Sequence, residues 1–326
     1  MDEHAVDSHV HFAPVVSSGE SDRYPRVVRS GGESEVWFKG SRVDSIVKEL
    51  AAVPTILEQE LACGIDRVVL SPWVALIPNS SDVQAATRDC RHLNSAIAAA
   101  VSRFTEARGL ATVPMADPKS SIEVLREALE MGLVGAEITP MAGKRFVGEE
   151  PFEPFWRYVA EQGVPIFIHP STHGLGIGAL ESSYLWNSLG NPVETGVAGA
   201  QLVMCGLLER YPDLRIVLAH SGGVLPWIIG RIDHSFGVRA EARSRLRSSP
   251  MESFRRLFYD SISHGEAQLR TLVELVGASQ IVLGTDHPFD MGEYGTKAVI
   301  EDLGLSKDER DRIVFGNALE LFGLSR

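Results

Sequence analysis

Short apolar runs rich in β-branched residues alternate along this chain with longer segments whose apolar positions recur every three or four residues. The short runs predict buried β-strands and the longer segments predict amphipathic helices, because the two structures repeat their side-chain directions with different periods. Eight strands are expected, at residues 4–10, 66–71, 109–114, 134–138, 164–169, 215–220, 256–261 and 280–286. Regular alternation of strand and helix indicates parallel βαβ units of the α/β class.

Several of the helical patterns between the strands end at glycine or just before proline, as helices commonly do. They include residues 45–64, 121–132, 154–163 and 200–213, and a last pattern follows the eighth strand at 306–323. Eight strands with helices between them predict a distorted (β/α)8 TIM barrel, as a single domain over 1–326. The alternative is a doubly wound open sheet, which would have fewer strands and usually a glycine-rich turn after the first, where this chain reads HVHFAP.

Two connections are too long to be simple turns, at residues 12–43 after the first predicted strand and at 170–192 after the fifth. The loops after the strands form the active-site face of such a barrel, and long loops there are commonly lids or binding loops. We therefore expect both segments beside the functional site. Tyr184 and Trp186 on the second are candidates to flank a planar substrate, and packing of the loop itself is the alternative.

The charge balance disfavours a nucleic-acid partner. Lysine and arginine together number 31 against 43 aspartate and glutamate residues, which gives a net charge of -12 and repels a polyphosphate backbone. The densest basic stretch, residues 238–249, contains Glu241 and no aromatic residue, so it is interpreted as a solvated surface. With 44% hydrophobic and 23% charged residues, the composition is that of a globular protein.

The cysteines and the apolar runs indicate in which cellular compartment the protein is expected. Cys63, Cys90 and Cys205 are far apart within helical patterns, so they predict buried thiols and neither a disulfide framework nor a zinc cluster. No apolar run approaches the roughly 18 residues of a membrane span, and acidic residues stand where a signal peptide carries basic ones. A cytoplasmic protein with no membrane partner is expected.

Titratable side chains close several of the predicted strands. His9 and His11 close the first strand, His169 the fifth, His220 the sixth and Asp286 the eighth. Residues two apart on a strand face the same way, so His9 and His11 can converge on one ion. Imidazole suits zinc and other first-row metals, and three histidines with one carboxylate leave room for water or substrate. A single histidine at a strand end would be interpreted as a packed residue. Because histidine or aspartate closes four different predicted strands, the sequence predicts a catalytic metal site.

Several motifs resemble those of one known family. DSHVHFAP, VPIFIHPS, IVLAHSGGVLPWIIGRIDHSF, LFYDSISH and IVLGTDHPF are similar, in this order and over nearly the whole chain, to motifs of the amidohydrolase superfamily. The similarity is to the branch of aminocarboxymuconate semialdehyde decarboxylase and related nonoxidative decarboxylases. It implies one divalent ion, Zn²⁺ first and Mn²⁺ second, held by His9, His11, His169 and Asp286. It also implies that His220 is the base and manages protons together with Asp286.

The resemblance also implies a homodimer. In the similar decarboxylases the arginine at the position of Arg231 reaches the neighbouring subunit's site and holds a substrate carboxylate, a task suited to a guanidinium group. A surface or interface salt bridge is the alternative for Arg231. Glu137 closes the fourth strand, where dinuclear relatives often carry a carboxylated lysine; it is interpreted as a structural carboxylate beside one metal, or otherwise as a bridging ligand.

One position departs from the resemblance and points to a different substrate. Glu58 stands near the place where the decarboxylase named above carries an arginine, and an acidic residue would repel a second substrate carboxylate. We therefore expect another compound unless a basic residue of the 12–43 segment substitutes. The candidates are Arg23, Arg26, Arg29, Lys39 and Arg42.

Two reactions fit these residues. The first is metal-dependent nonoxidative decarboxylation of a small unsaturated or aromatic carboxylic acid; the second is metal-dependent hydrolysis of a ring-cleavage product, a lactone or an amide. A non-catalytic protein would be expected to lack one of the site residues, and none is missing. Asp260 is expected to orient a neighbour or to cap a helix. Surface, loop or structural roles are expected for the other histidines considered, of which His173 is the best pocket candidate: His173, His234, His264 and His287.

Overall fold

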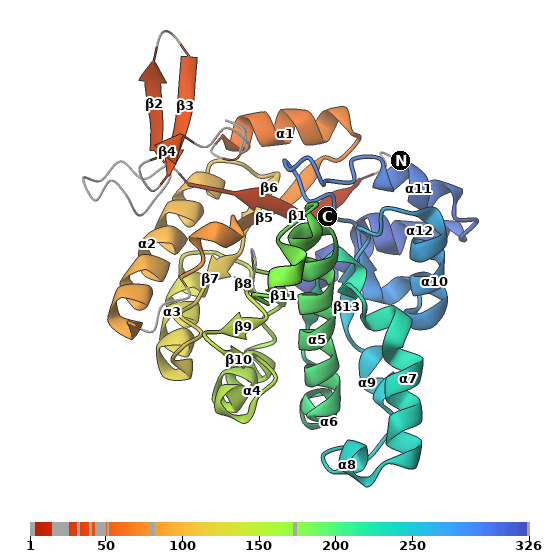
Figure 1. Ribbon diagram of the computed structural model, residues 1–326. Coiled ribbons are helices and arrows are strands. Elements are labelled where there is room, and N and C mark those ends of the chain that lie inside the picture. The colour runs from red at the N-terminus through yellow and green to blue at the C-terminus, as the bar shows by residue number, and fades with distance from the viewer. Residues whose placement is uncertain are drawn as a thin grey trace.

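The computed structural model describes residues 4–14, 26–30, 33–38, 41–42, 50, 52–78, 82–171 and 175–324. All eight predicted strands are present within a few residues of their expected bounds. The strands of the barrel are β1 (Val6–Phe12), β5 (Arg67–Pro72), β6 (Ala107–Gly109) with β7 (Ala111–Thr112), β8 (Ala136–Ile138), β11 (Ile166–Ile168), β12 (Ile216–Leu218), β13 (Phe258–Asp260) and β14 (Ile281–Val282). Figure 1 shows the helices arranged around the outside of these strands.

The strands close into a barrel of parallel neighbours. One sheet has the order β1-β5-β6 and the other the order β14-β13-β12-β11-β8-β7. The third predicted strand links the two sheets, because β6 pairs with β5 and β7 pairs with β8 on either side of Leu110. The last strand meets the first where Ser8 N–H donates to Leu283 O at 2.9 Å and His11 N–H donates to His287 O at 2.8 Å. The predicted TIM barrel is confirmed.

The helices follow the strands as the pattern predicted, with two differences in extent. The helix expected over 45–64 begins only at Val53 within the described residues, and the one expected over 200–213 is interrupted at Gly206, whose φ of +72° ends a helical turn. The helices are α1 (Val53–Ala62), α2 (Val83–Val101), α3 (Pro118–Glu130), α4 (Glu153–Gln162), α5 (Asn191–Met204), α6 (Leu207–Arg210), α7 (Leu225–Val238), α8 (Ala240–Arg243), α9 (Pro250–Phe254), α10 (Glu266–Val276), α11 (Thr296–Asp302), α12 (Lys307–Asp311) and α13 (Asn317–Phe322).

The interior of the barrel is apolar at one end. Inward-facing residues of six strands form one buried cluster together with the C-terminal helix α13. Its strand members are Val6, Val69, Leu110, Phe167, Val217 and Val282, and α13 contributes Ala318, Leu321 and Phe322. A larger apolar shell packs the helices against the outside of the strands. Polar side chains within the barrel therefore collect at the opposite, carboxyl end of the strands.

The two long connections have secondary structure of their own. The described part of 12–43 forms a small antiparallel sheet of β2 (Arg26–Ser30), β3 (Glu33–Phe38) and β4 (Ser41–Arg42), and Figure 1 shows it projecting from the barrel. A second hairpin, β9 (Met141–Ala142) with β10 (Arg145–Phe146), follows β8. The connection after β11 includes a single turn of π-helix at Trp186–Gly190 that runs into α5.

The cysteines agree only in part with the prediction of buried thiols. Cys90 is fully buried in α2, whereas Cys63 and Cys205 are half-buried because each directly follows the end of a helix. All three are free thiols. The basic stretch at 238–249 is largely exposed, as expected. Over the described residues, no helix combines the length and apolar character that crossing a membrane requires.

Candidate metal centre

His9 lies fully buried on β1, with one ring nitrogen fixed by a carboxylate. His9 Nδ1 lies 2.7 Å from Asp260 Oδ2 at the end of β13, and backbone N–H groups of His220, Ser221 and Ile262 donate to the same carboxylate. Asp260 therefore orients His9, which is one of its two expected roles. Burial lowers the pKa of His9, and Asp260 offsets part of this effect. With Nδ1 held in this way, His9 Nε2 is directed to the centre.

His169 presents a free ring nitrogen to the same place. His169 Nδ1 lies 2.8 Å from the carbonyl oxygen of Pro170, to which a protonated Nδ1 donates. Burial, followed by the neighbouring histidines, holds the pKa of His169 well below its usual value, so the ring is neutral at physiological pH. His169 Nε2 is buried and has no hydrogen-bond partner among the described residues. A neutral imidazole with an unpaired, buried nitrogen is the form that binds a metal ion.

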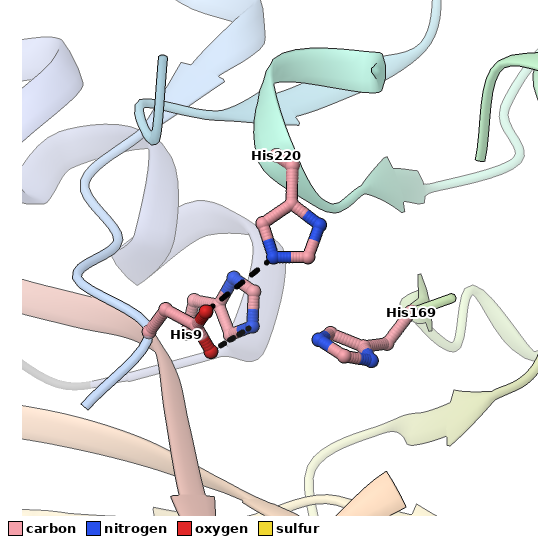
Figure 2. Close-up of side chains that lie close together, drawn as sticks. His9, His169 and His220 are labelled. Atoms are coloured by element: carbon pink, nitrogen blue, oxygen red, sulfur yellow. Dashed lines mark ion pairs between the residues drawn. The ribbon is translucent and has the colours of Figure 1, made fainter. Parts of the chain in front are cut away.

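Asp286 joins histidines from two strands of the barrel. His11 Nε2 lies 2.9 Å from Asp286 Oδ1, and the nearest nitrogens of His9 and His220 each lie 3.5 Å from an oxygen of the same carboxylate. Figure 2 shows the rings of His9, His169 and His220 turned toward one another, with dashed lines for ion pairs. Burial would raise the pKa of Asp286, but contacts from His11 and His220 outweigh it and hold the pKa well below its usual value. The carboxylate is therefore ionised.

Four side chains form a group suited to a metal ion. One ligand atom from each of His9, His169, His220 and Asp286 lies within 4.8 Å of all the others. His11 adjoins this group, because its Nε2 lies 3.2 Å from His9 Nε2. The lowered pKa values of His9 and His169, the ionised carboxylate of Asp286 and the unpaired His169 Nε2 fit a divalent ion of the zinc or manganese type.

His220 and Asp286 occupy strained backbone conformations. Their φ angles are +54° and +63°, in the left-handed region that residues other than glycine rarely adopt. Ser221, Gly222 and Gly223 continue the turn after His220 at positive φ, and the amides of both glycines bond to carbonyls of that turn. Burial alone would lower the pKa of His220; Asp286 more than offsets this, so the pKa is raised above its usual value. Strain of this kind is typical of functional sites.

Glu137 is a buried carboxylate at the end of β8 near this centre. Both carboxylate oxygens lack a hydrogen-bond partner among the described residues, and the side chain is fully buried. Burial raises the pKa of Glu137 to about 7, while the charge of nearby His11 works in the opposite direction. Glu137 therefore carries a proton during part of the physiological pH range.

The three residues predicted to bind substrate lie on the surface or in a loop. Arg231 is exposed on α7. Tyr184 and Trp186 pack edge to face with ring centroids 5.0 Å apart on the connection after β11. Burial and then the charges of Asp290 and Asp286 raise the pKa of Tyr184.

The remaining candidates fall in different environments. His234 and His264 are exposed, and His287 is buried with Nδ1 3.0 Å from Glu60 Oε1. His173 lies outside the described residues, as do the side chains of the five basic residues considered on the 12–43 segment. Glu58 is exposed on α1, whereas Glu60 on the same helix is buried.

Sequence reasoning missed a set of buried polar residues beside the centre. They are Asp7, Glu60 and Thr285, each at most 1% exposed. Two signals were available in the sequence. Asp7 is two residues before His9 and four before His11, so all three face the same side of the strand, and Glu60 falls on the apolar stripe of α1 with Val53 and Ile56. A carboxylate at an apolar position of a helix requires a partner inside the protein.

Comparison with known proteins gives a consistent result. The amidohydrolase family matches residues 6–324. A 2-amino-3-carboxymuconate-6-semialdehyde decarboxylase of Dictyostelium discoideum is 33% identical over 279 residues, which are 83% of this chain and 77% of that protein. A gamma-resorcylate decarboxylase of Polaromonas sp. is 28% identical over 280 residues, 81% of this chain and 85% of that protein.

A solved structure has the same fold. It is a 5-carboxyvanillate decarboxylase of Novosphingobium aromaticivorans complexed with manganese and 4-hydroxy-3-methoxy-5-nitrobenzoic acid. Its TM-score is 0.81 at 21% sequence identity, covering 98% of this chain and 96% of that one.

Proposed function

Because this chain belongs to the amidohydrolase family, in the branch of nonoxidative decarboxylases, we propose that it releases CO₂ from a small unsaturated or aromatic carboxylic acid. The observation that carries the proposal is the group of His9, His169, His220 and Asp286 at the carboxyl end of the barrel strands, with His220 half-buried and the other three buried. The relatives named above are decarboxylases of a muconate semialdehyde and of an aromatic acid. The reaction is the replacement of a carboxylate by a proton.

We assign the metal ligands as His9, His11, His169 and Asp286. The orientation of His9 by Asp260 and the unpaired nitrogen of His169 support this assignment. The ion is Zn²⁺, as the resemblance implies, or Mn²⁺, as in the carboxyvanillate enzyme. When bound, a divalent ion here supplies Lewis acidity toward the oxygens of the substrate.

His220 is assigned the proton transfer. Asp286 lies 3.5 Å from His220 Nε2 and raises the pKa of His220 above its usual value, which favours the charged imidazole in the metal-free chain. His220 delivers a proton to the carbon that bears the carboxylate, and the bond from that carbon to the carboxylate then breaks. The electron pair of that bond restores the unsaturated system as CO₂ leaves. A proton from solvent returns His220 to its starting state, so charge and atoms balance.

We propose a homodimer in which Arg231 serves the neighbouring site. The same region of α7 exposes large apolar side chains: Trp227 is 63% exposed, Ile228 39% and Val238 59%. Trp227, Arg231 and Val238 are spaced by four and seven residues, so they share one face of the helix. An apolar face of this kind beside an arginine favours contact with a second copy. Arg231 would then hold the substrate carboxylate, with Tyr184 and Trp186 against its unsaturated plane.

We also propose that the protein is cytoplasmic and consists of one domain. Three free thiols fit a reducing cytoplasm. The family match over 6–324 supports a single barrel domain over 1–326.

A substrate panel tests the reaction. Muconate-type, hydroxybenzoic and methoxybenzoic acids are incubated with protein loaded with Zn²⁺ or Mn²⁺, and CO₂ release is measured beside hydrolysis of a lactone, an amide and a ring-cleavage product. CO₂ release that stops on chelation supports decarboxylation. Hydrolysis without CO₂ release would establish the alternative reaction on the same residues.

A further inference from the structure

A second cluster of buried polar side chains lies beside the metal centre. Its members are Asp7 on β1, Glu60 on α1, and Thr285 and His287 on either side of Asp286. Each is at most 3% exposed, and the proposed reaction gives none of them a role. Buried polar groups that make so many mutual contacts fix the relative position of the segments that carry them.

Asp7 joins the segments that carry His9 and Asp286. One oxygen of the Asp7 carboxylate accepts the backbone N–H of His9 at 2.9 Å and that of Thr285 at 3.2 Å, and the other oxygen accepts the Thr285 hydroxyl. Because Thr285 immediately precedes Asp286, this one carboxylate sets the spacing between β1 and the end of the eighth strand.

Glu60 holds the chain on the other side of Asp286. Glu60 Oε1 lies 3.0 Å from His287 Nδ1, with the side chains 1% and 4% exposed. The backbone of His287 makes two hydrogen bonds. Its carbonyl accepts the N–H of His11 at 2.8 Å, and its N–H donates to Thr285 Oγ1 at 3.2 Å. The ring of His287 also packs at right angles to Tyr294, at 5.7 Å between centroids. The segment after Asp286 is therefore fixed by α1 through its side chain and by β1 through its main chain.

Asp286 is the residue that depends on this support. Its φ of +63° is a conformation that non-glycine residues keep only where the surroundings enforce it. Thr285 and His287 are its two chain neighbours, and each is held by a different buried carboxylate. If either anchor were removed, the backbone could relax toward negative φ and turn the Asp286 carboxylate away from His11 and His220.

We propose that the pair Glu60–His287 positions Asp286 for metal binding. Neither side chain touches the reacting atoms, so both are positioning residues and act through the backbone of Asp286. The inference rests on the proposed metal centre, and it adds that a carboxylate on α1, outside the barrel strands, determines how tightly the ion is held.

Metal affinity measured on the purified protein tests this role without reference to turnover. Glu60→Gln keeps the size of the side chain and replaces its carboxyl group with an amide, and we expect the Kd for Mn²⁺ to rise about tenfold or more, the usual effect of losing a group that orients a ligand. Glu58→Gln is the matched control, since Glu58 is an exposed glutamate on the same helix. Its Kd for Mn²⁺ should equal that of the wild type.

A second variant tests the pathway through His287. His287→Gln should weaken Mn²⁺ binding to a similar extent. Each substitution breaks the same contact between Glu60 and His287, so the Kd of the double variant should not exceed the larger of the two single-variant values. Glu60→Gln protein with wild-type Mn²⁺ affinity would overturn the positioning role, even if its stability fell. Wild-type protein that binds neither Mn²⁺ nor Zn²⁺ would overturn the proposed function itself, and the positioning role with it.

Discussion

Asp260 Oδ2 lies 2.7 Å from His9 Nδ1, and both side chains are fully buried. This contact fixes the ring of His9 and its tautomer, so that Nε2 is the nitrogen available to a metal ion. A carboxylate behind a ligand histidine also increases the basicity of the ring. The first prediction concerns this pair.

Asp260→Asn should lower the affinity for Zn²⁺ or Mn²⁺ by about 10–100-fold, because the neutral amide no longer selects the protonated Nδ1 of His9. Metal titration of the purified variant measures the effect. Asp66→Asn is the control: Asp66 contacts His4 Nδ1 at 2.8 Å in an exposed pair remote from the centre, and its loss should leave the metal affinity unchanged. Equal affinity in both variants would contradict the assignment of His9 as a ligand.

His220→Ala should reduce kcat by about 10²-fold or more while the protein keeps one equivalent of metal per chain, because a residue that transfers a proton contributes on that scale. Steady-state kinetics and elemental analysis of the same preparation give both quantities. His4→Ala, a change at an exposed histidine, should affect neither. Loss of metal together with activity would instead make His220 a ligand.

Mixing the inactive variants His220→Ala and Arg231→Ala should restore activity if Arg231 acts in the neighbouring site. A hybrid dimer then contains one site in which both wild-type residues are present. Activity is measured after the two proteins are mixed under conditions that allow subunit exchange, with each variant alone as the control. Absence of recovery in a mixture proven to contain hybrids would place Arg231 outside the shared site.

Glu137→Gln should stabilise the metal-depleted protein at high pH. The pKa of Glu137 is raised from its usual 4.5 to about 7, so the folded state holds a proton that the unfolded state releases over this range. The stability that protonated Glu137 contributes is present below pH 4.5 and is lost as the pH rises through about 7. The unfolding free energy of the variant minus that of the wild type should therefore be larger at pH 8 than at pH 4.5, by up to about 3 kcal/mol.

Urea unfolding of both proteins at several pH values measures this difference. A difference in unfolding free energy that stays constant between pH 4.5 and pH 8 would show that Glu137 titrates normally in the folded chain.

Gly284→Ala should weaken metal binding by displacing His9. A Cβ at Gly284 would lie 2.9 Å from the Cβ of His9 and 3.1 Å from the Cβ of Asp260, and both neighbours are fixed within the barrel. Overpacking of this kind costs about 1–3 kcal/mol of stability. At Gly295 an added Cβ meets nothing within 4 Å, so Gly295→Ala is the matched control. Thermal unfolding and metal titration of the two variants provide the comparison.

The strand ends were predictable from the sequence because each is a local pattern. An apolar run closed by His9 and His11, by His169 or by Asp286 carries its own signal, and parallel packing places the ends of all such runs at one edge. The antiparallel sheet within 12–43 and the break at Gly206 were not predicted, because a small sheet inside a long connection and a turn inside a helical pattern give only weak periodic signals.

The roles of Glu60 and Asp260 depend on contacts between segments far apart in the chain. Glu60 lies on the helix α1, and its partner His287 follows the eighth strand, so most of the barrel separates the two residues in sequence. The closeness of Asp260 to His9 arises only when β13 and β1 take their places in the closed barrel. Periodicity identifies which face of an element is buried, but it does not identify the neighbour.

The union of the last strand with the first also has a consequence for biosynthesis. His9 precedes Asp286 by most of the barrel in sequence, yet one ligand atom of each lies within 4.8 Å of the other. A ribosome-bound chain therefore carries isolated histidines that compete poorly for cellular metal until Asp286 has been made. With the proposed ligands, metal capture requires a closed barrel, and a chain terminated before Asp286 would emerge without its ion.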